Sequence, residues 1–184
     1  MRSFLNGLYA ASEWLAMTAL AATAILVFAQ VAGRVFDTLL VMAGNRPYGF
    51  LVPSLAEIAG FLLVAASFLA LAGSFRAGTH IRVTLAIAPL PTGLRHVVEV
   101  AVLAVATAIA GLFAWYVALL ALDSVRYNEL SYGIIAIPLW IPQGAMAVGA
   151  AIFTLSLVDD FAAAVTGGTP SYLASDRGDE TEVV

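Results

Sequence analysis

Residues 53–73 read PSLAEIAGFLLVAASFLALAG, an apolar run in which Glu57 is the single charged residue. A helix of about 20 residues rises about 30 Å, which is the thickness of the hydrocarbon core of a bilayer. Three further runs, at residues 14–33, 97–122 and 138–158, are as long and as poor in charge. The sequence therefore predicts an all-α integral membrane protein with four transmembrane helices.

The composition excludes several other classes of protein. Of the 184 residues, 62% are hydrophobic and 11% are charged, so a soluble domain could not cover its apolar surface. The chain has no cysteine, which excludes disulfides and cysteine metal sites. No basic stripe for nucleic acid is present. We expect residues 1–165 to form the membrane domain and residues 166–184 to form an acidic, solvated tail.

The arginines predict the orientation of the chain, because cytoplasmic loops retain basic residues. All eight basic residues are arginines. With a cytoplasmic amino terminus, the inner segments hold Arg2, Arg76, Arg82, Arg95 and Arg177, and the outer ones hold Arg34, Arg46 and Arg126. This excess predicts that both termini lie in the cytoplasm. The first apolar run is longer than the core of a signal peptide, about 7–15 residues, and helical character could continue past it toward Met42, so we expect it to be retained as a helix.

Local motifs mark the helix ends. Ser54 and Glu57 match a capping box, in which each side chain bonds a free backbone N–H at the helix start, and a subunit contact is the alternative role for them. Pro138 and Pro142 fit the start of the fourth helix. Between the second and third helices, residues 78–91 interleave apolar and polar side chains, which predicts an interfacial segment, either a short helix or a covered elbow.

Small residues form a possible packing stripe on the third helix. Ala106, Ala110, Ala114 and Ala118 recur every four residues, a spacing that lets membrane helices approach closely. The alanine-rich composition could also produce this pattern without a packing role. The stripe is therefore a candidate surface for helix association.

Ionisable residues near the membrane are candidates for function. Glu13 lies beside Trp14, where it can reach headgroup water, and Arg34 can pair with Asp37 at the opposite end of the first helix. No carboxylate falls in the middle of a span. Asp159 and Asp160 oppose the dipole of the fourth helix without an evident reason.

The sequence lacks the usual catalytic and ligand-binding motifs. His80 and His96 do not have metal-ligand spacing, and no nucleophile or phosphate-loop motif is present. We therefore predict no catalytic, cofactor, metal or substrate site and no enzyme activity. Two alternatives remain open: a self-contained four-helix carrier of the small multidrug-resistance kind, with Glu13 as its carboxylate, and a membrane-bound enzyme or haem protein.

Several motifs carry a resemblance to a known family. They are the Glu57-Ile58-Ala59-Gly60 start of the second helix, Gly78-Thr79-His80-Ile81-Arg82-Val83 followed by Leu90-Pro91, Gln30-Val31-Ala32-Gly33-Arg34, and Ile137-Pro138-Leu139-Trp140 with Gly149. Over about residues 10 to 160, the chain resembles the small, DctQ-type membrane subunit of tripartite ATP-independent periplasmic (TRAP) transporters. It departs from the family at Ala56-Glu57, where paired glutamates are frequent, and at Thr84, where an acidic residue is frequent.

The resemblance implies a subunit of the bacterial inner membrane that acts as a scaffold. Its partners would be a large membrane subunit, which carries the substrate and sodium sites, a periplasmic substrate-binding protein that delivers an organic acid or related solute, and membrane lipids. No cofactor is expected in this chain. In this interpretation the candidate cytoplasmic anchors are Arg76, His80, Arg82 and Arg95, and the candidate periplasmic docking residues are Arg34, Arg46, Arg126 and Glu129.

Overall fold

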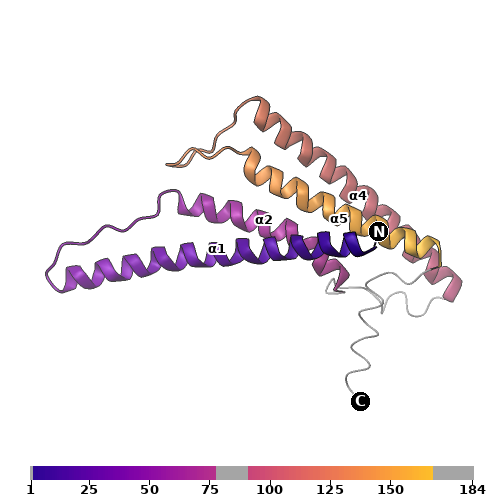
Figure 1. Ribbon diagram of the computed structural model, residues 1–184, viewed down its shortest axis with the longest axis horizontal. Helices are drawn as coiled ribbons and strands as arrows, with labels where there is room; N and C mark the ends of the chain where they lie inside the picture. Colours follow the sequence, from indigo (N-terminus) through magenta and orange to yellow (C-terminus); the bar gives the residue numbers. More distant parts are fainter. Residues whose placement is uncertain (1, 78–90, 168–184) are drawn as a thin grey trace, which may run out of the picture.

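The computed structural model describes residues 2–77 and 91–167, and most of this part of the chain is helical (Figure 1). The helices are α1 (Arg2–Met42), α2 (Leu55–Arg76), α4 (Thr92–Arg126) and α5 (Trp140–Val165). All four are long and apolar enough to cross a membrane, so the predicted all-α membrane fold is confirmed. Within the described ranges, β pairing is limited to an isolated bridge between Leu130 and Pro138.

The helices extend beyond most of the predicted boundaries. α1 begins before residue 14 and continues past residue 33, because polar residues such as Arg34 and Asp37 do not interrupt a helix that has left the hydrocarbon. It ends at Met42, two residues before Gly44, whose φ of 78° is the left-handed conformation common after a helix end. At about 1.5 Å per residue, α1 is about 62 Å long, α4 about 52 Å and α2 about 33 Å.

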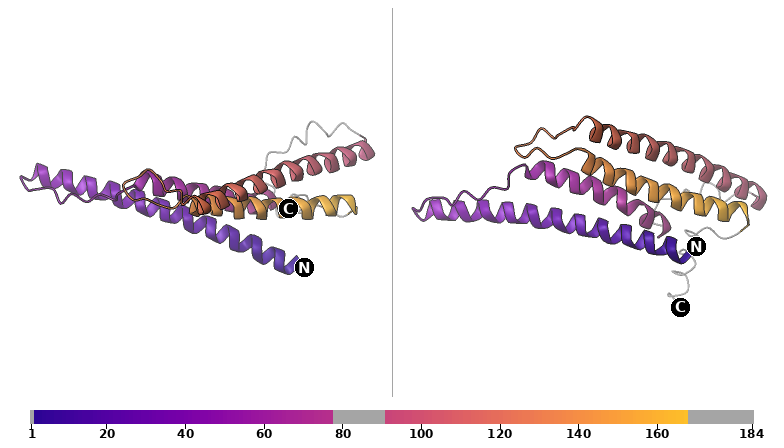
Figure 2. Two further views of the ribbon diagram at one scale, coloured as in Figure 1. Left: turned by 90° about the horizontal axis from the view of Figure 1, so that it is seen from above. Right: turned by 45° about the horizontal axis from the view of Figure 1, so that its top comes forward.

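The four helices lie side by side in the order α1, α2, α5, α4, and each contacts its neighbours in this order (Figures 1 and 2). Helices that follow one another along the chain are antiparallel, so the neighbours α2 and α5 run in the same direction. One end of the layer, called the inner end here, holds the starts of α1 and α4 and the ends of α2 and α5. The opposite, outer end holds the connecting segments 43–54 and 127–139.

The core of the layer lies on both sides of α5. In the most apolar stretch of α5, 39% of the residues are buried, compared with 11% in α1 and in α4. Leu103, Leu157 and Ala164 form one buried cluster between α4 and α5. Tyr9, Ala72 and Ile152 form a second cluster, joining α1, α2 and α5. The outward faces of α1 and α4 remain exposed and apolar, as a membrane protein requires.

Gly149 sets the distance between α2 and α5. A Cβ atom at this position would lie 2.5 Å from the carbonyl carbon of Phe68 and 2.8 Å from the backbone nitrogen of Leu69. The α5 backbone therefore packs directly on that of α2, which is the close approach that small residues permit between membrane helices.

Candidate functional site

A buried polar junction joins α1, α2 and α5 near the inner end. Its four buried polar side chains are those of Tyr9, Ser12, Ser156 and Asp160, each no more than 4% exposed. The Ser12 hydroxyl donates a 2.6 Å hydrogen bond to the Leu69 carbonyl, across the contact between α1 and α2. Since polar groups are costly to bury, this junction is a specific feature of the fold and not a by-product of apolar packing.

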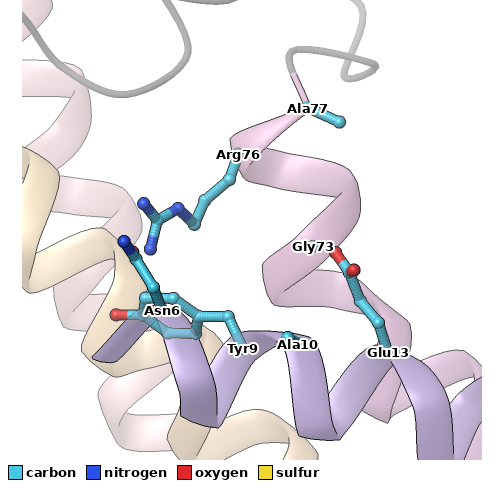
Figure 3. Close-up of a pocket in the computed structure, with 7 residues that line it drawn as sticks. All are labelled: Asn6, Tyr9, Ala10, Glu13, Gly73, Arg76 and Ala77. Atoms are coloured by element: carbon cyan, nitrogen blue, oxygen red, sulfur yellow. The ribbon is translucent and has the colours of Figure 1, made fainter. Parts of the chain in front are cut away.

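An open pocket of about 320 Å³ lies beside this junction, between α1 and α2 (Figure 3). The Arg76 guanidinium carbon lies 4.5 Å from the centre of the Tyr9 ring, which is a cation–π contact. Glu13 packs against Gly73, where a Cβ atom would overlap the carboxylate. Gly73 is within one turn of the end of α2, so Glu13 lies toward the inner end of the layer and not in its middle.

An apolar groove of about 350 Å³ follows α5 between α2 and α4. Phe68 of α2 and Phe113 of α4 stack with ring centres 5.6 Å apart, so the two helices approach each other over one face of α5. The groove is lined by Leu71 from α2, Ala106, Ile109, Ala110 and Phe113 from α4, and Ala150, Phe153 and Leu157 from α5. It offers a shaped apolar surface and no group that could do chemistry.

At the outer end, three residues of α1 hold the segment that returns toward α2. Gln30 accepts a 2.7 Å hydrogen bond from the Val52 N–H. The Phe50 ring covers Gly33, where a Cβ atom would lie 2.5 Å from it. Asp37 accepts hydrogen bonds of 2.7 and 3.0 Å from the backbone N–H groups of Tyr48 and Gly49. Gln30, Gly33 and Asp37 recur at helical spacing, so residues 48–52 lie along one face of α1.

The segment 127–139 closes the outer end on the other side. Ser124, which is fully buried, donates a 2.6 Å hydrogen bond to Glu129. The Ser131 N–H bonds to the Ile137 carbonyl at 2.8 Å, and the Ile137 N–H bonds to the Ser131 hydroxyl at 3.0 Å. Gly133 packs against Ser54 and Glu57 at the start of α2. This end of the layer therefore consists of loops fastened to helix ends.

The chain is matched by the family model "Tripartite ATP-independent periplasmic transporters, DctQ component" over residues 23–167. The chain belongs to the DctQ family. Comparisons with curated proteins and with solved structures give no match. This DctQ protein is thus a small membrane subunit of a TRAP transporter, from a family of transporter subunits and not of enzymes. Tyr9, Ser12 and Glu13 precede the matched range, whereas Arg76, Asp160 and the whole groove lie within it.

Two local predictions about this DctQ subunit are wrong. Ser54 does not cap α2, because it has a left-handed backbone with φ 55° and makes no capping hydrogen bond. Its hydroxyl instead accepts a 2.9 Å hydrogen bond from the Ile135 N–H, and Glu57 packs against Gly133. Arg34 does not pair with Asp37 among the described residues, because the Asp37 carboxylate is taken by the loop. In both cases a distant loop competes with the local partner.

The predicted docking residues all lie at the outer end. Arg34 and Arg46 are exposed on α1 and on segment 43–54. Arg126 and Glu129 are exposed at the end of α4 and just after it. Arg126 lies 3.9 Å from Asp123, whereas Glu129 is held by Ser124. Arg34 and Arg46 therefore belong to α1 and the segment after it, and Arg126 and Glu129 to α4 and the segment after it.

The predicted anchors are only partly described. Arg76 lies in the inner-end pocket, and Arg95 lies, half-buried, near the start of α4. His80, Arg82 and the predicted interfacial segment 78–91 lie outside the described residues, apart from Pro91. The tail from residue 168 onward is outside them too.

The predicted alanine stripe lies along one side of α4, where all four alanines are half-buried. Ala106 and Ala110 pack against the Leu103 cluster and also line the groove. The most buried positions of α4 are Leu103, Val117 and Ser124; Leu103 packs on α5, and Ser124 bonds to Glu129. The stripe is therefore at the border between the contact with α5 and the open groove.

The sequence did not predict the buried polar junction. The adjacent acids Asp159 and Asp160 were its only visible signal, and Asp160 is buried to 3% exposure. Tyr9 and Ser12 lie at helical spacing with the buried Ala16, on the part of α1 that precedes the predicted span. Within residues 2–77 and 91–167, no group of three or more histidine, aspartate or glutamate residues could hold a metal ion.

Proposed function

We propose that this DctQ subunit is the static scaffold of its TRAP transporter in a bacterial inner membrane, with both termini in the cytoplasm. In this proposal it supports a large membrane subunit, which carries the substrate and sodium sites. A periplasmic binding protein delivers an organic acid or a related solute. The small subunit handles no solute itself.

The open layer is the observation that carries this proposal. The four helices lie side by side and leave the long apolar faces of α1 and α4 exposed, together with a groove over α5. In the described part of the chain, the charged residues gather at the two ends of the layer and not along its middle. A carrier needs a polar path between its helices, whereas a scaffold needs a broad surface for a neighbour.

Purification of the subunit from its native membrane tests this function. We expect a larger multi-helix subunit to co-purify with it, and we expect liposomes to accumulate solute only when both subunits are present. A homodimer without a larger partner, or uptake into liposomes that contain this chain alone, would contradict the scaffold.

We place the large subunit on the groove, because Ala106 and Ala110 of the predicted stripe line it. Ile109 lines the groove and is 63% exposed, whereas Val105, one turn earlier, is 59% exposed and does not line it. We expect Ile109→Trp to reduce the co-purified large subunit several-fold and Val105→Trp to leave it unchanged. Equal yields from both variants would remove the groove from the interface.

The rival function, a self-contained carrier, has less support from the position of Glu13. A carrier carboxylate must exchange a proton for a substrate inside the bundle, yet Glu13 is exposed at the level of Gly73. Transport by the isolated chain that is lost on Glu13→Gln would establish this rival.

We also propose that the outer end helps to dock the periplasmic protein, through Arg34, Arg46, Arg126 and Glu129. The support is their exposure at the outer end. Joint neutralisation of the four residues should slow uptake at low concentrations of the binding protein. Unchanged uptake would defeat this assignment.

A further inference from the structure

We propose that the inner-end pocket binds the headgroup of a phospholipid that carries a primary amine, such as phosphatidylethanolamine. The pocket is lined by Asn6, Tyr9, Glu13 and Arg76 as its polar residues, with Ala10, Gly73 and Ala77 between them (Figure 3). Its volume of about 320 Å³ is at the lower end of the range for small-molecule sites, about 300–1,000 Å³. It is open and partly polar, whereas the groove over α5 is apolar.

The charges of the pocket match a zwitterion. Arg76 and Glu13 come from different helices, and among the described residues neither makes an ion pair. A guanidinium binds a phosphate through charge-assisted hydrogen bonds, and a carboxylate accepts N–H bonds from an ammonium group. The lining holds one positive and one negative side chain, so a headgroup with one charge of each sign fits it better than an anionic headgroup does.

The Tyr9 ring argues for a primary amine and against choline. A trimethylammonium group has no N–H donor and is recognised by the open faces of aromatic rings. The Arg76 guanidinium already covers a face of the Tyr9 ring at 4.5 Å, and Tyr9 is 4% exposed. Among the residues that line the pocket, the partner left for the ammonium group is the Glu13 carboxylate, which needs N–H donors.

The position of the pocket points to a lipid and not to a soluble zwitterion. It opens between α1 and α2 within one turn of the end of α2, which is where headgroups meet a membrane-spanning helix. Next to Glu13, Trp14 is 67% exposed, as an interfacial tryptophan is, and Met17 follows one turn further into the membrane at 49%. Acyl chains of a bound lipid would run along this exposed face of α1.

Native mass spectrometry of the purified complex, with matched lipids added, tests the proposal. We expect at least tenfold higher retention of phosphatidylethanolamine than of phosphatidylglycerol or phosphatidylcholine. Glu13→Gln should bring retention of phosphatidylethanolamine to within twofold of phosphatidylcholine, and Arg76→Gln should lower retention of all three lipids. Asp123→Asn and Arg126→Gln are the controls for the two substitutions. They change an exposed acid and a helix-ending arginine at the outer end, and both should leave lipid retention unchanged.

Two further measurements keep the proposal falsifiable where a variant does not fold. With the unmodified protein, stepwise N-methylation of the lipid amine should lower retention at each step, and equal retention along the series would overturn the role of Glu13. Soluble glycerophosphoethanolamine should not displace the lipid. Displacement at equal concentration would assign the pocket to a soluble ligand and overturn the proposal that it binds a lipid. The outcome is separable from the scaffold function, which is measured by co-purification of the large subunit.

Discussion

The inner and outer ends of this layer are held together by different kinds of contact. At the inner end, the contacts run from helix to helix and are buried, as in the bond from Ser12 to the Leu69 carbonyl. At the outer end, side chains such as Gln30, Asp37 and Ser54 hold the backbone of loops. The inner end therefore fixes how the helices lie relative to each other, whereas the outer end fixes the surface that the loops present.

Gly149 lies between the two ends, so its substitution should have the largest effect. In Gly149→Val, the side chain would push the α5 backbone away from Phe68, whose carbonyl carbon would lie 2.5 Å from the new Cβ. Overpacking of this kind costs about 3 kcal/mol when the neighbour is backbone and cannot rotate away. We expect a clearly lower unfolding temperature in detergent and loss of the co-purified large subunit.

Gly144→Val is the matched control for that prediction. Gly144 is on the same helix, and a Cβ atom there would meet nothing within 4 Å. Its unfolding temperature should stay close to that of the unmodified protein. An equal decrease of the unfolding temperature in both variants would show that the effect at Gly149 does not come from its contact with α2.

Ser12→Ala should weaken the inner end alone. Hydrogen bonds between membrane helices are worth about 0.6 kcal/mol on average and up to about 1.7, and this one is short and buried. We expect a loss of about 1 kcal/mol in the free energy of unfolding. In the control Ser67→Ala, the lost bond runs within α2, from Ser67 to Leu63, and the residue is exposed. A loss as large in the control would refute a specific role for the contact between α1 and α2.

Asp37→Ala should loosen the outer end and spare the helices. The substitution removes the acceptor of the Tyr48 and Gly49 N–H groups, so the loop opens more often. Chymotrypsin should then cleave after Tyr48 or Phe50 about tenfold faster, which corresponds to a decrease of about 1.4 kcal/mol in the free energy of loop opening. The unfolding temperature should hardly change. Thr38→Ala, which removes an exposed bond to the Arg34 carbonyl, should not alter the cleavage rate; slow cleavage of both variants would mean that Asp37 does not hold this loop.

The smallest effect is expected at Asp123. Its ion pair with Arg126 spans 3.9 Å and both side chains are more than half exposed, so solvent screens it. Asp123→Asn should leave the unfolding temperature and its dependence on salt unchanged. A marked loss would show that charge, and not the bonds to loop backbone, secures the outer end.

The sequence was sufficient for the fold because lipid imposes a simple rule. Runs of apolar residues such as 53–73 and 138–158 need no partner to be recognised as spans, and their order predicts alternating directions. The apolar run 14–33 marks only part of α1, which begins before it and continues to Met42, because polar residues such as Arg34 and Asp37 do not stop a helix. Residue type alone cannot tell where a helix leaves the hydrocarbon.

The sites were harder to predict because they depend on contacts between distant residues. Ser54 and Glu57 have the spacing of a capping box, yet Ile135 and Gly133, about 80 residues later, compete for them. Tyr9, Ser12 and Asp160 become a junction only when α1, α2 and α5 meet. The alanine stripe was visible because small residues repeat within one helix, but only the structure shows that Ala106 and Ala110 border a groove.

The unequal lengths of the helices have a consequence for the surrounding lipid. α2, inside the layer, matches one bilayer, whereas α1 and α4 form its two edges and are much longer. A helix whose apolar length exceeds the hydrocarbon thickness either tilts or thickens the lipid beside it, so hydrophobic mismatch concentrates at the edges. A neighbour that slides along this layer would therefore cross a membrane of uneven thickness. The elastic energy of the bilayer would change along its path and would contribute to the force that acts on it.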